Sequence, residues 1–319
     1  YYFSDHAYVG TGEPFKTLEL PHHFEMASRP QGENYLVEIV RLDAAISRGW
    51  LDTLRGTGIL YYDNSNAEQV DLSRFAGWQD RRLELGGDWN VNGGRYYVRI
   101  CKTGPHFQLL QASGTGQSQS IPHLMGQRPS LIVAKNLDDA GTAHVVQHRD
   151  LGAGNYLYLG STAASASHAG IWGQTEPDAS QFTVGANIET KGSGDRMIYQ
   201  LWADAEGLFQ AGSYRGNGSN EGDFLGGFVP RHIHIKRSDS GGTSHMTLDA
   251  YRDGINPLSE AVFLEAAAAA NSASPYSVRL SAGGMLIAGN SVATNASGGQ
   301  YVYWGRALYT ATKSSPPLP

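Results

Sequence analysis

Apolar and polar residues alternate with a period of two in several short segments of the chain. In PRHIHIK (230–236), isoleucine alternates with histidine, which is typical of a β-strand whose two faces have different surroundings. Aromatic or β-branched runs bounded by glycine, such as NYLYLG (155–160) and QYVYWG (300–305), predict further strands. Turn signals recur about every ten residues, which predicts an all-β chain of antiparallel strands in a sandwich or barrel.

Some stretches depart from this pattern. Residues 36–50 have some helical spacing, although YLVEIVR (35–41) reads as a strand. Residues 261–265 are predicted to form a strand, and the alanine run at 266–270 is either a loop or one short helix. The proline-rich end SSPPLP (314–319) cannot pair in a sheet and is expected to be a linker or an extended arm.

A Gly-x-Gly turn occurs three times at nearly equal intervals. The first glycines of the turns, Gly10, Gly114 and Gly216, are 104 and 102 residues apart. A Pro-x5-Lys pattern, PSLIVAK (129–135) and then PRHIHIK, recurs after 101 residues. YLVEIVR is a plausible first copy with Arg41 in the lysine place, but its offset is 94, so an insert is expected upstream. The following segments carry the same Gly-rich turn before a closing strand: NVNGGRYYVRI (90–100), KGSGDRMIYQL (191–201) and NASGGQYVYWG (295–305).

Self-similarity at this interval predicts three tandem, similar β-sandwich or jelly-roll-like units of about 100 residues. The predicted boundaries are 1–105 (divergent, with PHHFEMASRPQ at 21–31 as its insert), 106–207 and 208–309, followed by a tail or linker at 310–319. Arg215, Val9 and Ser113 stand before the repeated turns and share no chemistry. The turns are therefore expected to reflect backbone geometry, because glycine adopts φ > 0 at little steric cost.

These units resemble a known family. The resemblance rests on the motifs Tyr-x-Gly-Asn-Gly (214–218), Pro-x5-Lys, YLYLxxTAA (156–164) and Gly-Gly-x-Tyr-x-Tyr (298–303). They are similar to a repeated β-rich domain of unknown function found in tail-fibre-like and other structural proteins of marine tailed bacteriophages. The resemblance covers nearly all of residues 106–309 and is weaker before them. It implies a virion protein, carries over no catalytic residue, and implies a homotrimer as in fibres; three units in one chain could instead form a pseudo-threefold monomer.

Composition and charge narrow the range of partners. Only 17% of the residues are charged, and 40 glycines and 17 tyrosines suit a β-rich globular chain. A net charge of −6 without a Lys/Arg run argues against nucleic acid, and no apolar run approaches the ~18 residues of a membrane span. Cys101 is the single cysteine, so an internal disulfide is impossible. Because the chain starts at Tyr1, we expect an internal segment of a longer protein or a processed start.

Histidines and paired acids are the first candidates for chemistry. Neither group has the spacing of a metal site, a nucleophile elbow or a phosphate loop, so no metal, cofactor or catalytic residue is predicted. The candidate histidines are His22, His23, His144, His148, His232 and His234, and they are expected on solvent-facing sides of the sheets. The acidic pairs Glu176/Asp178, Asp138/Asp139 and Glu221/Asp223 lie in Gly-, Ser- or Pro-rich contexts, where acids most often begin turns.

Tryptophans in Gly- or Pro-bordered segments are the candidate ligand-binding residues. Trp78, Trp89 and Trp172 have such surroundings, and exposed aromatic rings bind sugars or partner proteins. The alternative is that each ring caps the end of a sandwich core. Further aromatic residues, Tyr96, Tyr97, Tyr301 and Tyr303, are assigned mainly to the core or to an interface.

Three functions follow as hypotheses. The first is a non-enzymatic structural virion protein, a tail fibre or surface fibre segment whose partners are other virion proteins and a host-cell surface polysaccharide or receptor. The second is a capsid decoration or tail accessory protein without receptor binding. The third, a carbohydrate-active enzyme or its lectin module, is ranked below both.

Overall fold

The chain is all-β in the computed structural model, which confirms the predicted fold class. The structure describes residues 3–13, 16–19, 34–79, 82–250, 257–258, 260–265, 277–281 and 283–307. The predicted insert at 21–31, the alanine run at 266–270 and the tail at 310–319 lie outside these residues. Among the described residues, the short helical segments are η2 (Gly87–Trp89), α1 (Ala169–Trp172) and α2 (Ile188–Lys191).

Three large antiparallel sheets follow one another along the described chain and share one strand order. The first sheet has the order β1 (Phe3–Val9), β9 (Arg95–Lys102), β3 (Tyr35–Arg41), β4 (Gly49–Asp52), β5 (Gly58–Tyr61) and β6 (Gln69–Val70). The second has β10 (Phe107–Ser113), β17 (Arg196–Trp202), β12 (Leu131–Asn136), β13 (Val145–His148), β14 (Asn155–Tyr158) and β15 (Ala166–Ser167). The third has β18 (Phe209–Arg215), β25 (Gln300–Arg306), β20 (His232–Arg237), β21 (Met246–Asp249) and β22 (Val262–Phe263).

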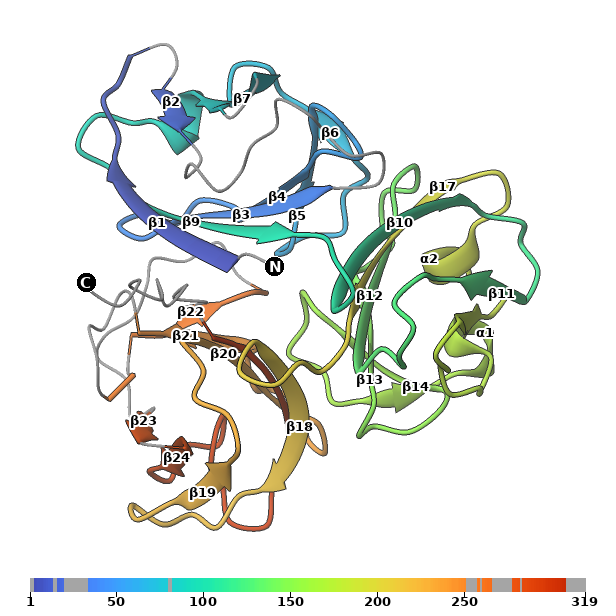
Figure 1. Cartoon of the computed structure of the whole chain (residues 1–319), viewed down its shortest axis with the longest axis vertical. Coiled ribbons are helices and arrows are strands. Elements are labelled where there is room, and N and C mark those ends of the chain that lie inside the picture. The colour runs from blue at the N-terminus through green and yellow to red at the C-terminus, as the bar shows by residue number, and fades with distance from the viewer. Residues whose placement is uncertain are drawn as a thin grey trace, which may run out of the picture.

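In each large sheet, the strand that is last in the sequence lies between the two strands of that sheet that come first. The first and last strands of the sheet therefore pair directly. A smaller antiparallel sheet covers one face of each large one, as in a sandwich. These small sheets are β2 (Lys16–Glu19), β8 (Arg82–Leu85) and β7 (Phe75–Gln79); β11 (Gln119–Pro122) and β16 (Gln181–Val184); and β19 (Asp223–Gly226), β24 (Gly284–Ala288) and β23 (Ser277–Ser281). Figure 1 shows the resulting three lobes around a common centre, with the small sheets outermost.

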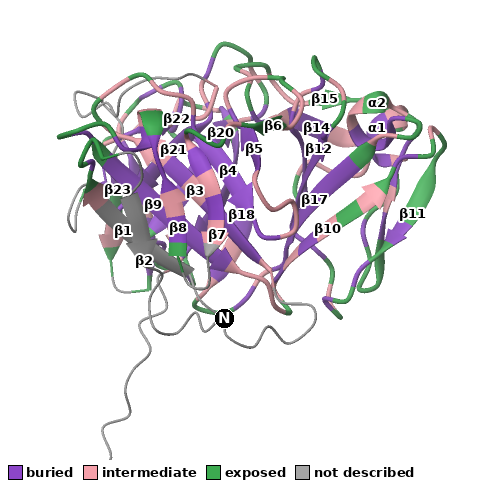
Figure 2. Cartoon of the chain, turned by 90° about the horizontal axis from the view of Figure 1, so that it is seen from above, coloured by how far each residue is buried: buried purple, intermediate pink, exposed green. Residues whose placement is uncertain are grey.

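The buried residues form one hydrophobic cluster within each lobe and one that is shared by all three. The shared cluster includes Trp50 from the first lobe, Trp202 from the second and Trp304 from the third. Both faces of a large sheet are therefore covered, one by its small sheet and the other by neighbouring lobes. The large sheets are buried along most of their length in Figure 2. A shared core makes the lobes parts of one packed body.

The repeated Gly-x-Gly turn follows the first strand of each large sheet. A Cβ on Gly10, Gly114 or Gly216 would lie 2.0, 1.7 or 2.3 Å from a backbone carbonyl oxygen, that of Val91, Gly192 or Ala296 respectively. These distances are too short for any side chain. The second glycine of each turn has a positive φ, between +66° and +74°. Backbone approach and φ thus explain the repeated glycines, as the sequence predicts.

The helical spacing of residues 36–50 does not produce a helix. The segment forms β3 and β4, which pair with each other as neighbours in the first sheet. Its apolar side chains are buried on both faces of that sheet, so the pattern reflects burial on two sides. Of the strand predicted at 261–265, only Val262–Phe263 form one, β22, which pairs with β21, and residues 264–265 are a turn.

Candidate functional site

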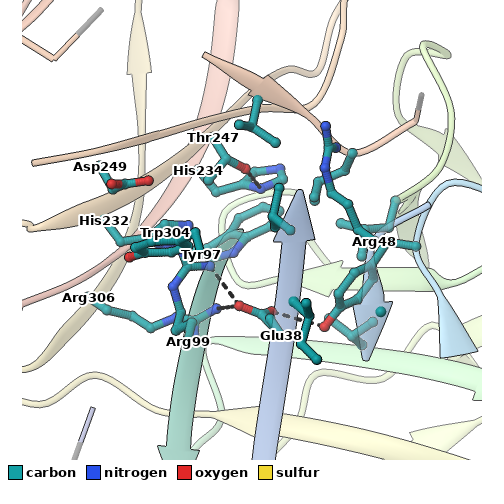
Figure 3. A pocket seen from close by; sticks show the side chains of 18 of the residues that line it. Glu38, Arg48, Tyr97, Arg99, His232, His234, Thr247, Asp249, Trp304 and Arg306 are labelled. Carbon is teal, nitrogen blue, oxygen red and sulfur yellow. Dashed lines mark hydrogen bonds and ion pairs between the residues drawn. The ribbon is translucent and has the colours of Figure 1, made fainter. Parts of the chain in front are cut away.

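A cavity of about 50 Å³ lies where the three large sheets meet. Its walls include a structurally equivalent cross-strand pair from each sheet. These pairs are Glu38 opposite Arg99, Val133 opposite Gln200, and His234 opposite Trp304. The second sheet contributes mainly apolar side chains, so the charged groups gather between the first and third sheets. Figure 3 shows several of them around Glu38.

Glu38 is the centre of a buried ionic cluster. Its Oε2 accepts hydrogen bonds from Arg99 Nη1 at 2.6 Å and Arg306 Nη2 at 3.5 Å, and its Oε1 accepts one from Tyr62 Oη at 2.9 Å. Burial by itself would raise the pKa of Glu38. The guanidinium groups of Arg306 and Arg99 outweigh that effect and hold it at about 2. Glu38 is therefore ionised at neutral pH and links the first sheet to the third.

Arg306 has further contacts across the centre. Its Nη1 donates to Cys101 Sγ at 3.0 Å, and its guanidinium carbon lies 4.6 Å from the ring centroid of Trp202 in the second lobe. Burial opposes the charged form of Arg306, but Glu38 outweighs this and raises its pKa. One side chain thus contacts both other lobes.

Histidine side chains complete the third sheet's wall. The ring of His234 stacks on Trp304, with 3.7 Å between ring centroids and an interplanar angle of 11°. Its Nε2 lies 2.8 Å from Nδ1 of His245, so one of these nitrogens donates to the other. Burial is the main cause that lowers the pKa of both rings well below 6.5, and nearby cations such as Lys236 lower it further. Both rings are therefore neutral at pH 7.

Two buried histidines of the second lobe lie against the neighbouring lobes. His144 lies beside the aromatic rings of Trp50 and Tyr62, with centroids 5.8 and 5.4 Å away. His148 Nε2 lies 3.1 Å from the carbonyl oxygen of Tyr303 in the third lobe. Burial lowers the pKa of His144 well below 6.5 and that of His148 to about 4.

Comparison with known proteins identifies a family to which the chain belongs. The family model described as Domain of unknown function (DUF7483) matches residues 90–307, more than half of the chain. The chain belongs to this family. The DUF7483 match begins just before β9 and includes the second and third lobes, so it contains Arg99, His234 and Arg306 but not Glu38. A comparison with curated proteins finds no match to the chain.

The lobes of this DUF7483 member are also joined by equivalent lysines. Lys135 Nζ donates to the carbonyl oxygens of Thr142 at 2.5 Å and of Ser65, in the first lobe, at 3.3 Å. Lys236 Nζ donates in the same way to Thr243 at 2.6 Å and to Thr162, in the second lobe, at 3.2 Å. Burial lowers the pKa of both ammonium groups to about 8. The lysine of the Pro-x5-Lys pattern therefore holds the loop of the preceding lobe.

The prediction of solvent-facing histidines is wrong for all four that the structure describes. His144, His148, His232 and His234 are each less than 5% exposed. The period of two correctly places His232 and His234 on one face of β20, but that face points to the molecular centre. His22 and His23 lie outside the described residues.

The three predicted tryptophans do not come together. Trp89 and Trp172 are fully buried in the clusters of the first and second lobes, so neither presents a ring at the surface. Both occupy the core, which was the alternative interpretation. The ring of Trp89 lies against Gly49, where a Cβ would be 2.3 Å from the indole. Trp78 in β7 is partly exposed, and its Nε1 donates to Gly56 O at 3.0 Å.

The acidic pairs serve local structure. Asp138 pairs with Arg196 at 2.7 Å, Glu176 pairs with Arg128, and Asp178 Oδ1 accepts from the backbone of Ser180 at 2.7 Å. Asp223 accepts from Asn217 at 3.0 Å. Within the described part of the chain, no group of three or more His, Cys, Asp or Glu side chains is placed to hold a metal ion. No described helix is both long and apolar enough to span a bilayer.

Proposed function

We propose that the chain is a non-enzymatic structural component of a phage-like particle, a fibre segment or another protein of the virion surface that contacts other virion proteins. The observation that carries this proposal is the ionic cluster at the molecular centre. Arg99 of the first lobe and Arg306 of the third both donate to Glu38, so this buried charge cluster joins two lobes. Such an arrangement suits a rigid building block.

The shared core supports the same proposal. Trp50, Trp202 and Trp304 belong to one buried cluster, so one lobe cannot move away without exposing large aromatic surfaces of the others. Resistance to deformation is what an external particle part requires. The resemblance of residues 106–309 to domains of phage structural proteins is the reason for proposing that the chain is part of a phage-like particle.

The proposal includes contact with host-cell glycans. Of the three predicted tryptophans, Trp78 is the one left as a candidate glycan-binding residue. Burial of Trp89 and Trp172 favours the second candidate function, a capsid decoration or tail accessory protein without receptor binding. A Trp78→Ala variant separates the two. Loss of particle adsorption to host cells supports glycan contact, whereas unchanged adsorption supports decoration. Leu72→Ala, which removes a nearby exposed apolar side chain, is the matched control.

Gradient-purified particles test the proposal as a whole. We expect the chain to sediment with the particles and to release no oligosaccharide from host surface polysaccharide. A chain found only in the particle-free soluble fraction would contradict a structural role. Oligosaccharide release by the purified chain would instead indicate a carbohydrate-active enzyme.

A further inference from the structure

The small sheet of the third lobe carries an exposed aromatic ring on its outward face. This sheet consists of β19, β24 and β23 and lies on the outside of the lobe, away from the molecular centre (Figure 1). Leu225 and Met285 are cross-strand partners and point inward to the hydrophobic cluster of the lobe. Because side chains alternate along a strand, their neighbours Phe224 and Leu286 point outward. Phe224 is 56% exposed, and Leu286 is half-buried.

The ring of Phe224 lies along the surface of the sheet. A Cβ on Gly284 would be 2.5 Å from Cζ of this ring, and a Cβ on Gly226 would be 3.3 Å from its Cε1. Gly226 and Gly284 are themselves cross-strand partners, so the ring rests on a pair of glycines. One face of the ring therefore contacts the backbone, and the other faces solvent. Phe224 and Leu286 together form a flat apolar surface, which we call the Phe224 platform.

The second lobe shows that the fold does not require apolar side chains at these two positions. In its small sheet Ser120 is the cross-strand partner of Thr183, and Ile121, the next residue of β11, points into the core of that lobe. Ser120 and Thr183 therefore occupy the places of Phe224 and Leu286. The Phe224 platform is thus specific to the third lobe, and an exposed apolar patch of this kind is typical of a binding surface.

A positively charged side chain borders the Phe224 platform. Arg279 of β23 is the cross-strand partner of Leu286, so these two residues and Phe224 form one row across the three strands. Two strand spacings place the Cα of Arg279 about 10 Å from that of Phe224. Arg279 is exposed, and within the described part of the chain no carboxylate pairs with its guanidinium. Ser281, two residues further along β23, is exposed on the same side of the sheet.

The area of the Phe224 platform limits the kind of partner. A stable protein interface buries about 800 Å² on each side around an apolar core, and two apolar side chains do not supply such a core. A single sugar ring needs only a surface of its own size. One face of a pyranose presents C–H groups with a small positive charge, which the negative face of an aromatic ring attracts.

The polar edge of the sheet selects among sugars. The hydroxyl groups of a pyranose lie around its rim, where Ser281 offers a donor and an acceptor. A carboxylate on the rim matches the planar guanidinium of Arg279, which binds carboxylates through two parallel hydrogen bonds. A neutral sugar would leave this guanidinium without a partner. Charge complementarity therefore favours an acidic pyranose.

We propose that the outward face of β19, β24 and β23 binds acidic pyranose units of a polysaccharide. The sugar ring stacks on Phe224 and Leu286, and its carboxylate pairs with Arg279. This inference rests on the proposed contact with host-cell glycans, and it adds to that contact a site in the third lobe and a class of sugar. Because the charged contact is exposed to solvent, the affinity falls as the salt concentration rises.

Biolayer interferometry of the full chain tests the site, with polygalacturonate, polysialic acid and neutral dextran immobilised in turn. We expect binding to at least one of the acidic polysaccharides and none to dextran. Phe224→Ala and Arg279→Gln, which remove the ring and the charge, should each weaken the binding at least about fivefold. Two matched controls should retain it. Leu124→Ala removes a side chain that is 89% exposed in the second lobe, and Arg95→Gln removes a positive charge from an exposed position of β9.

Amide chemical shifts of the unaltered chain give a second readout, which is needed if Phe224→Ala does not fold. Trigalacturonic acid should shift the amide signals of Phe224, Leu286 and Arg279 and leave those of Ser120 and Thr183 in place. Binding to neither acidic polysaccharide, or equal binding by all four variants, would overturn the proposal. A dimer that depends on Phe224 in sedimentation velocity would also overturn it, because the face would then bind a second copy of the chain.

The result is separable from the test of the structural role. A chain that sediments with particles but binds neither acidic polysaccharide keeps its structural role and lacks this site. A chain that binds them through Phe224 and Arg279 but stays in the particle-free fraction has the site and lacks the structural role.

Discussion

Arg306 Nη1 donates to Cys101 Sγ at 3.0 Å, although the two residues are 205 positions apart. Cys101 belongs to β9 of the first sheet and Arg306 to β25 of the third. The first lobe is joined to the second by Arg196 and Glu68, whose side chains lie 2.8 Å apart, and the second to the third by Lys236 and Thr162. The last lobe thus returns to the first, and the three lobes form a closed arrangement.

Removing the charge of Glu38 should destabilise this arrangement strongly. Glu38→Gln leaves Arg99 and Arg306 buried without their shared carboxylate, and breaking a buried ion pair costs about 3–5 kcal/mol. Urea unfolding at neutral pH measures the change. Glu206→Gln, at an exposed position, is the control and should change stability by less than about 0.5 kcal/mol. Equal effects of the two variants would show that the central cluster does not hold the lobes together.

Acid should destabilise the fold through its buried histidines. Burial lowers the pKa of His144, His234 and His245 well below the 6.5 of an exposed ring. As pH falls below 6.5, the unfolded chain takes up protons that the folded chain does not. Each of these histidines therefore lowers the free energy of unfolding by up to about 1.4 kcal/mol per pH unit. Glu38 adds to the loss only below about pH 4.5, where the unfolded chain begins to take up a proton that the folded chain binds only near its pKa of about 2.

His144→Leu isolates one of these contributions. Urea unfolding between about pH 8 and 5 should show a slope smaller by up to about 1.4 kcal/mol per pH unit than that of the unaltered chain. Stability that stays constant from pH 7 to 5 in the unaltered chain would contradict neutral buried histidines.

The inter-lobe lysines predict that stability also rises with pH in the alkaline range. Lys135 and Lys236 have a folded pKa of about 8, below the 10.5 of the free side chain, because burial disfavours the ammonium. Between these values the unfolded chain binds more protons, so stability should rise with pH. Lys135→Met should flatten that rise in unfolding curves from pH 8 to 10. A slope unchanged in Lys135→Met and in Lys236→Met would contradict the burial of these ammonium groups.

The sequence predicted the strands and the turns better than it predicted the site. The period of two in PRHIHIK is correct because a strand exposes alternate residues to opposite faces. It does not tell which face meets water. In this fold both faces of β20 are covered. The prediction that His234 faces solvent is therefore wrong, because its side of the strand faces the molecular centre. The pairing of Glu38 with Arg306 joins residues 268 positions apart, and no local pattern encodes such a contact.

The turn glycines are predicted to tolerate no side chain. In Gly114→Ala the new methyl group would lie 1.7 Å from the carbonyl oxygen of Gly192, so the first and last strands of the second sheet must separate there. We expect a loss of about 3 kcal/mol or more, at the upper end of overpacking costs. Gly241→Ala, whose Cβ meets no described atom closer than 3.7 Å, should change stability by less than about 1 kcal/mol. Similar losses in both variants would refute the steric explanation.

An electron cryo-microscopy map of the native particle tests the proposed function most directly. The account predicts density for a three-lobed body at the particle surface, into which the closed arrangement of Figure 1 fits as one rigid unit. Density at the tail would identify a fibre or tail component, and density over the head a decoration protein. A particle map without this body, from preparations in which the chain stays in the soluble fraction, would contradict the account.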